Sequence, residues 1–185
     1  MKFLFASDSF KGTLSSQKTA ELLTKAAREI FPDCRYDSIV VADGGEGTTD
    51  AVLAATNGQK ISLQVHGPLW EDITCSYGIL DQNRVVMEMA AASGLPLVPK
   101  EKKDPRYTTS YGTGEMIADA LKRGYRDISI AIGGSATNDG GIGCIRALGG
   151  KFLDDCGQEL KGCGEDLIKI RKNRFDRVEP TGERM

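Results

Sequence analysis

The sequence is short of the residues that build most metal centres and nucleophilic triads. Its 185 residues include one histidine, His66, and five cysteines with no CxxC pair. A lone histidine excludes a multi-histidine metal site, and it excludes a Ser-His-Asp triad unless His66 serves alone. An odd number of cysteines without that spacing argues against a disulfide framework and against structural zinc. We therefore expect reduced thiols.

Long apolar runs and a surplus of positive charge are also missing. The formal net charge is −2 and the lysines and arginines are scattered, so no basic stripe that could bind a nucleic-acid backbone is present. The apolar run at the N-terminus is ended by Asp8, too early for a signal peptide. No stretch approaches the roughly 20 apolar residues that span a bilayer. The sequence predicts a cytoplasmic protein that binds neither nucleic acid nor membrane.

The common nucleotide-binding fingerprints do not occur either. There is no GxxxxGK[ST] motif and no complete GxGxxG spacing, since Gly141-x-Gly143, for example, is followed by Arg146 where the last glycine is needed. The HRD and DFG signatures of protein kinases are absent as well. Any phosphate chemistry must therefore use other loops.

Glycine is what the sequence has in excess. Its 22 glycines exceed the average usage of about 7%, and most fall in a few clusters. Clustered glycine indicates tight backbone, often around a ligand. Apolar residues make up 40% and charged residues 27% of the chain, which is ordinary for a globular protein with a buried core.

Apolar periodicity predicts an α/β fold with a parallel sheet flanked by helices. Within residues 1–58, two apolar runs that end in aspartate alternate with two helical patterns, the order typical of a parallel sheet. Residues 59–105 contain three strand-like runs, which we expect to begin a smaller, β-rich second domain. Residues 106–185 return to the α/β pattern and end in a charged, weakly patterned tail that offers no packing face.

Three glycine clusters follow strand ends and carry carboxylates. We call them the first turn (Asp8-Ser9-Phe10-Lys11-Gly12), the second turn (Asp43-Gly44-Gly45-Glu46-Gly47-Thr48) and the third turn (Gly133-Gly134-Ser135-Ala136-Thr137-Asn138-Asp139-Gly140-Gly141). Ligands of parallel α/β sheets bind outside the carboxyl ends of the strands, so we expect the three turns to face one cleft.

The composition of these turns is typical of phosphoryl transfer. Glycine-rich backbone and helix N-termini suit phosphate, whereas the acids at the same turns would repel it. A divalent cation such as Mg²⁺ resolves that conflict, because it bridges carboxylates and phosphate oxygens. An aspartate can also accept the proton of a substrate hydroxyl while Lys11 neutralises developing charge. Together these parts outline a kinase.

Each residue also has a structural interpretation. Asp8 or Asp43 taken singly fits a helix cap equally well, and an isolated Lys11 is more often a solvated surface lysine. Ser135 and Thr137 would also serve as caps of the helix that follows them. The concurrence of three clusters at strand ends favours the functional interpretation, because helix caps seldom need so many glycines.

Five motifs in register connect the sequence to a known family. They are SDSFKGTLSS at residues 7–16, VADGGEGTTDA at 41–51, EMAAASGL at 88–95, TSYGTGEMI at 109–117 and IGGSATNDGG at 132–141. In order and spacing they closely resemble the bacterial glycerate kinase family, over roughly residues 1–165.

The resemblance implies transfer of the γ-phosphate of ATP to a hydroxyl of D-glycerate, with Mg²⁺, to give 2-phosphoglycerate or 3-phosphoglycerate. It also implies two α/β domains with the site between them. No residue in the sequence specifies the length of the substrate's carbon chain, so a kinase for another small sugar acid is an alternative.

The residues expected to form the site come from the three turns and from the strand end near residue 88. We expect Asp8, Lys11 and Asp43 to be catalytic, and Ser9, Glu88 and Ser93 to contact substrate. The nucleotide or its phosphates are assigned to Gly44, Gly45, Gly133, Gly134, Ser135 and Thr137, and the metal to Asp43, Glu46 and Asp139.

Family members are considerably longer than this sequence. We therefore expect the missing half to complete the sheet and part of the nucleotide site, and we expect little or no turnover from these 185 residues alone. The alternative from another class is a non-catalytic module that forms a homodimer, in which a second copy covers an exposed sheet edge.

Overall fold

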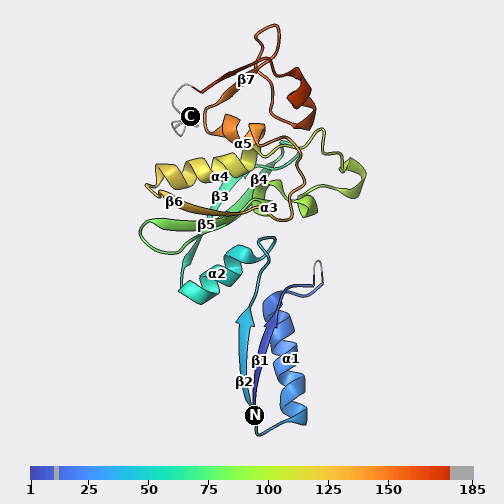
Figure 1. Ribbon diagram of the computed structural model, residues 1–185, viewed down its shortest axis with the longest axis vertical. Coiled ribbons are helices and arrows are strands. Elements are labelled where there is room, and N and C mark those ends of the chain that lie inside the picture. The colour runs from blue at the N-terminus through green and yellow to red at the C-terminus, as the bar shows by residue number, and fades with distance from the viewer. Residues whose placement is uncertain (11–12, 176–185) are drawn as a thin grey trace.

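The computed structural model describes residues 1–10 and 13–175. Over these residues the strands form a two-stranded, a four-stranded and a second two-stranded sheet. In Figure 1 these three parts follow one another along the long axis of the molecule, with the N-terminus at one end. The α/β class with a parallel sheet flanked by helices is confirmed.

The N-terminal part is a β-α-β unit. Strands β1 (Lys2–Ser7) and β2 (Arg35–Val40) pair in parallel, and helix α1 (Ser16–Ile30) connects them. The side chain of Ser15 accepts a hydrogen bond from the backbone N–H of Lys18 at 3.1 Å, which caps the start of the helix.

Only one face of this small sheet is covered. Phe3 and Tyr36 face α1, with ring centroids 5.6 Å apart, and the Tyr36 hydroxyl donates to the Ala27 carbonyl at 3.0 Å. Side chains alternate across a strand, so the next residues point the other way, where Leu4 is 58% exposed and Ile39 is 52% exposed. A sheet normally buries both apolar faces.

The central part is a mixed sheet covered by helices on both faces. Its strands occur in the order β3 (Gln59–His66), β4 (Asp72–Ile79), β5 (Arg84–Glu88) and β6 (Asp127–Ala131). The first three are antiparallel neighbours, and β6 joins β5 in parallel. Helix α2 (Thr48–Thr56) lies on one face and α4 (Tyr111–Lys122) on the other (Figure 1).

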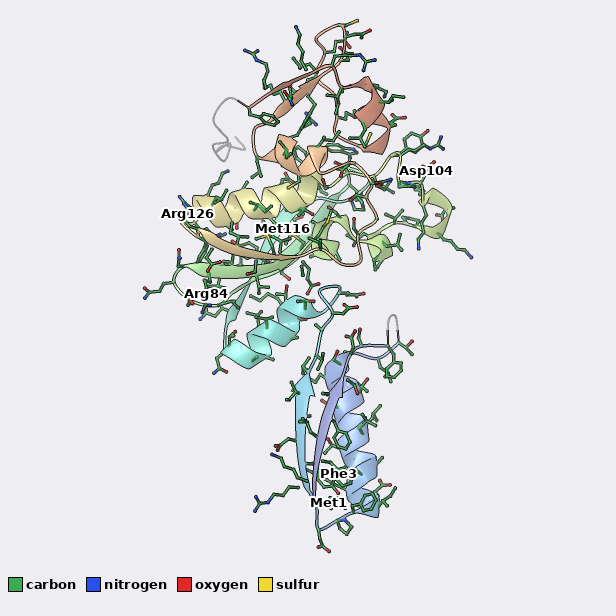
Figure 2. The ribbon with its side chains drawn as sticks, viewed as in Figure 1. Met1, Phe3, Arg84, Asp104, Met116 and Arg126 are labelled. Atoms are coloured by element: carbon green, nitrogen blue, oxygen red, sulfur yellow. The ribbon has the colours of Figure 1, made fainter. Side chains whose placement is uncertain are left out.

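The main core lies between this sheet and α4. Met116 of α4 points into it (Figure 2). The other fully or almost fully buried members are Val65, Cys75, Tyr77, Val85, Met87, Ala92 and Ala120. Alternation along β5 sends Val85 and Met87 toward α4, and therefore sends Glu88 toward α2.

Short elements complete the chain after β5 and β6. They are α3 (Ala90–Ser93), η1 (Leu95–Leu97), η2 (Lys100–Lys102), α5 (Ile142–Ala147), β7 (Lys151–Leu153), η3 (Gly164–Lys169) and β8 (Lys172–Arg174). Within the described residues, no helix has the length and apolar character needed to cross a membrane.

The C-terminal tail, which we predicted to be charged and weakly patterned with no packing face, begins with a short strand. Strand β8 pairs antiparallel with β7, and Phe175 packs edge-on against Phe152 with ring centroids 6.0 Å apart. Lys172, Asn173 and Arg174 are all exposed, so this strand carries no alternation of polar and apolar residues that a sequence could display. Residues 176–185 lie outside the described residues.

The pairing of the elements crosses the predicted segment boundaries. Helix α2 belongs to residues 1–58 but packs against β4 and β5, and β6 belongs to residues 106–185 but pairs with β5. The division at residues 58 and 105 stays a prediction about domains.

Two glycines let α4 approach its neighbours closely. A Cβ atom at Gly112 would lie 1.9 Å from the carbonyl oxygen of His66, and one at Gly114 would lie 2.3 Å from that of Cys144. The GTG sequence that begins α4 is therefore a close-packing surface against β3 and α5.

We expect Gly112→Ala to lower the free energy of unfolding by about 2 kcal/mol or more, because the new methyl group overpacks against the backbone of β3. At an unhindered helix position, glycine to alanine raises the free energy of unfolding by roughly 0.5–1 kcal/mol, so the sign of the change distinguishes close packing from open space. Urea unfolding measures it.

The matched control is Gly124→Ala. Gly124 has a φ of 95° and no atom within 4 Å of its virtual Cβ, so this variant should lose only the backbone term of about 1 kcal/mol. A Gly112→Ala variant as stable as the wild type would contradict the close packing.

Candidate functional site

The second turn connects β2 to α2 and is held by its own side chain. The Asp43 carboxylate accepts a hydrogen bond from the Gly45 N–H at 3.0 Å. Gly47 has a φ of 90° and is the residue before α2, a conformation that favours glycine. The Thr48 hydroxyl donates back to the Gly45 carbonyl at 2.8 Å.

Glu88 ties this turn to the central sheet. Its carboxylate lies at the end of β5, is 8% exposed, and accepts hydrogen bonds from the Gly47 N–H at 3.2 Å and the Thr49 N–H at 2.5 Å. These are N–H groups that the first turn of a helix leaves without partners, and a carboxylate is favoured there by the helix dipole. Glu88 therefore caps α2 from another element.

The third turn touches the second directly. The Gly133 N–H donates to the Gly44 carbonyl at 2.8 Å, and a Cβ at Gly133 would lie 2.8 Å from that oxygen. On its other side the third turn is held by α3 and η1, through bonds from the Leu95 N–H to the Gly134 carbonyl and from the Ala136 N–H to the Ser93 carbonyl, each 2.9 Å long.

The first turn approaches from the end of β1. The Ser9 N–H donates to the Asp8 carboxylate at 2.7 Å, so this aspartate fixes its own turn. Lys11, predicted to be catalytic, lies outside the described residues.

A cavity of about 610 Å³ lies where the first and second turns face the central sheet. Three predicted site residues, Ser9, Glu46 and Glu88, line it. The wall residues that the sequence did not single out are of two kinds. Those with polar side chains are Thr13, Ser15, Ser16, Gln17, Thr49, Asp50, Lys60 and Ser76, and the apolar ones are Leu14, Val40, Ala51, Ala54 and Ala91.

These additional lining residues come mainly from the first turns of α1 and α2. The Ser-Ser pair before α1 and the Thr-Thr pair of α2 carried the only signal that could have indicated them, a cluster of hydroxyls at helix starts. Lys60, at the beginning of β3, forms an ion pair with Asp50 and had no such signal.

Two predicted site residues have other surroundings. Ser93 is fully buried, and its hydroxyl is hydrogen-bonded to that of Thr113 at 2.9 Å. Asp139 is 2% exposed, and its oxygens accept from the N–H groups of Ser110, Gly141 and Gly143 and from the Ser110 hydroxyl. We propose that both support the third turn instead of contacting a ligand.

The side chains of the third turn bond to one another. The Ser135 and Thr137 hydroxyls lie 2.8 Å apart, and the Ser135 oxygen also accepts from the Thr137 N–H at 3.0 Å. Gly134 has a φ of 74°, which turns the backbone sharply beside them. Their assignment to phosphate binding stays a prediction.

The second turn offers the donor atoms that Mg²⁺ takes. Asp43 and Glu46 place two exposed carboxylates on one turn, and Mg²⁺ typically binds one or two carboxylates together with phosphate oxygens and water. Within residues 1–10 and 13–175, the tight groups of three acidic or thiol ligands lie elsewhere, at residues 154–156 and 163–166. The second turn is not among them, so its two carboxylates would fit a magnesium ion only together with phosphate oxygens and water.

The cysteines supply no nucleophile to this region. All five are free thiols. Burial raises the pKa of the Cys75 thiol to about 12 and that of Cys144 to about 11, so neither is ionised near neutral pH.

Comparison with known proteins gives a consistent result. The sequence model of a family described as "Glycerate kinase family" matches residues 3–185. Glycerate 2-kinase of Escherichia coli strain K12 is 53% identical over 181 residues, which are 97% of this chain and 48% of the relative. Glycerate kinase of Bacillus subtilis strain 168 is 49% identical over 171 residues, or 92% of this chain and 45% of the relative.

A solved structure agrees. The crystal structure of a protein assigned as glycerate kinase 2 from Salmonella typhimurium LT2 superposes with a TM-score of 0.78 at 43% identity, covering 95% of this chain and 47% of that one. The chain thus spans about half the length of the curated relatives it matches. With the family match extending over nearly all of its residues, the chain belongs to the glycerate kinase family.

Proposed function

We propose that the whole protein transfers the γ-phosphate of ATP to a hydroxyl of D-glycerate and yields phosphoglycerate in the cytoplasm. One observation carries this proposal: two glycine-rich turns are in backbone contact beside a cavity with acidic and hydroxyl-bearing walls. Glycine-rich backbone suits the phosphates of a nucleotide, and the acidic cavity suits a ligand that presents hydroxyl groups.

Each residue near the cavity has a proposed role in phosphoryl transfer. Asp8 or Asp43 accepts the proton of the attacking hydroxyl or anchors the metal, and Glu46 is a second metal ligand. Mg²⁺, held by such carboxylates, would neutralise charge on the transferred phosphoryl group. Lys11 neutralises further negative charge, and Ser9 and Glu88 position the acceptor.

The phosphates are assigned to the junction of the second and third turns. The residues concerned are Gly44, Gly45, Gly133, Gly134, Ser135 and Thr137. The N–H groups of Gly45, Gly133 and Thr137 already donate within the protein, so the backbone donors proposed for the anion are those of Gly44, Gly134 and Ser135.

A chimera tests this function independently of the length of the chain. In this chimera, residues 1–185 of the present chain replace the matching segment of the E. coli glycerate 2-kinase, which is 53% identical. We expect the chimera to phosphorylate D-glycerate with ATP and Mg²⁺, in a coupled assay for ADP release, whereas the 185-residue chain alone gives little turnover. A folded chimera without glycerate-dependent activity would contradict the proposal.

In the chimera, Asp43→Asn and Lys11→Ala should each lower kcat/KM by about 10²-fold or more, because a base, a metal ligand or a charge stabiliser is lost. Asp37→Asn is the control, since Asp37 is an exposed β2 residue paired with Lys2. Full activity of both site variants would refute these roles.

A second candidate, a non-catalytic module that forms a homodimer, is favoured by one observation. The sheet face opposite α1 leaves Leu4 58% and Ile39 52% exposed, and a second copy would cover it. A kinase for a related small sugar acid remains the alternative within the enzyme class.

Light scattering after size exclusion gives the mass of the isolated chain in solution and so distinguishes a homodimer from a monomer. We expect the double variant Leu4→Lys/Ile39→Lys to reduce the apparent mass of the isolated chain, because charge on this face opposes burial. Ile168→Lys, at an apolar residue that is 81% exposed on η3, should leave the mass unchanged. A monomeric wild type with a cooperative melt would rule the module out.

A further inference from the structure

Thr49 carries an unusual hydroxyl group. The residue is 5% exposed, and its Oγ1 atom is buried without a hydrogen-bond partner among residues 1–10 and 13–175. A buried polar atom without a partner costs about 1–3 kcal/mol, so native proteins contain few of them and each needs an explanation.

Other helical threonines of the chain do not share this property. The hydroxyls of Thr19 and Thr56 each donate to the carbonyl four residues earlier, at 3.0 and 2.8 Å. For Thr49 that acceptor is the Gly45 carbonyl, which already accepts from both the N–H and the hydroxyl of Thr48, at 3.3 and 2.8 Å. The start of α2 thus leaves Thr49 without the usual intrahelical acceptor.

Thr49 lies in the wall of the 610 Å³ cavity, together with Glu88. Its backbone N–H donates to the Glu88 carboxylate at 2.5 Å, so the two residues are direct neighbours. Rotation about the Cα–Cβ bond exchanges the methyl and hydroxyl positions, and both rotamers are populated by threonine in helices. A ligand in the cavity can therefore recruit this hydroxyl.

The chemistry of the pair selects one kind of ligand group. The Glu88 carboxylate only accepts hydrogen bonds, and it repels another anion, whereas the Thr49 hydroxyl both donates and accepts. An alcohol matches the two at once, since it donates to the carboxylate and accepts from Thr49. The carboxylate or phosphate end of a ligand is disfavoured at this wall.

We propose that the Thr49 hydroxyl binds an alcohol group of the acceptor substrate and thereby selects dihydroxy acids over monohydroxy acids. This role rests on the proposed function, and it adds a specificity residue to the predicted site.

Equilibrium binding to the full-length chimera tests the inference without requiring turnover. Calorimetry with D-glycerate and with glycolate, which has one hydroxyl fewer, is compared between wild type and Thr49→Val. We expect the variant to bind D-glycerate about three- to tenfold more weakly, the effect of one lost hydrogen bond, and glycolate as the wild type does. Thr49→Ser should keep the wild-type preference.

Thermal melting separates this from a structural role. Thr49→Val removes a hydroxyl without a hydrogen-bond partner, so the Tm of this variant should not fall. Thr56→Val is the control for binding: it removes a hydrogen-bonded hydroxyl outside the cavity and should leave the affinity for D-glycerate unchanged. Equal D-glycerate affinity of wild type and Thr49→Val would overturn the inference and leave the proposed function standing. A folded chimera with the wild-type Thr49 that binds no D-glycerate would overturn both.

Discussion

The site depends on the carboxylate of Glu88. It lies at the end of a central strand and accepts hydrogen bonds from the N–H groups of Gly47 and Thr49, donors that the first turn of α2 leaves without intrahelical partners. This contact fixes the second turn against the four-stranded sheet. The third turn follows, because the Gly133 N–H bonds to the Gly44 carbonyl. One buried acid thus aligns two loops that are far apart in sequence.

Elements with a clear period could be predicted from sequence, and contacts between them could not. The apolar runs at β1 and β2 and the helical spacing of α1 were sufficient for a β-α-β unit. The parallel pairing of β6 with β5 has no signal in the local sequence, because the partner of a strand depends on the packing of the whole sheet. From the sequence, Gly112 could be interpreted only as part of a helix start, although its lack of a side chain permits the close approach of α4 to β3.

The candidate site was predictable in kind but not residue by residue. An acid at a strand end has the same local pattern whether it faces a ligand or satisfies buried donors. Glu46 lines the cavity and Asp139 caps the N–H groups near α5, yet each is followed directly by glycine in the sequence. Thr49 was missed because its distinguishing feature is a hydrogen bond that it does not make, and the Gly45 carbonyl four residues earlier already accepts both donors of Thr48.

The same geometry resolves the conflict between acids and phosphate that the sequence posed. The N-terminus of α2, an attractive phosphate site by its dipole, is already occupied by the Glu88 carboxylate. A second anion there would meet a buried negative charge. In the function that we propose, phosphate binds at the backbone where the second and third turns meet, and the alcohol groups of the acceptor lie near Glu88 and Thr49. The acids and the glycines then serve opposite ends of one reaction.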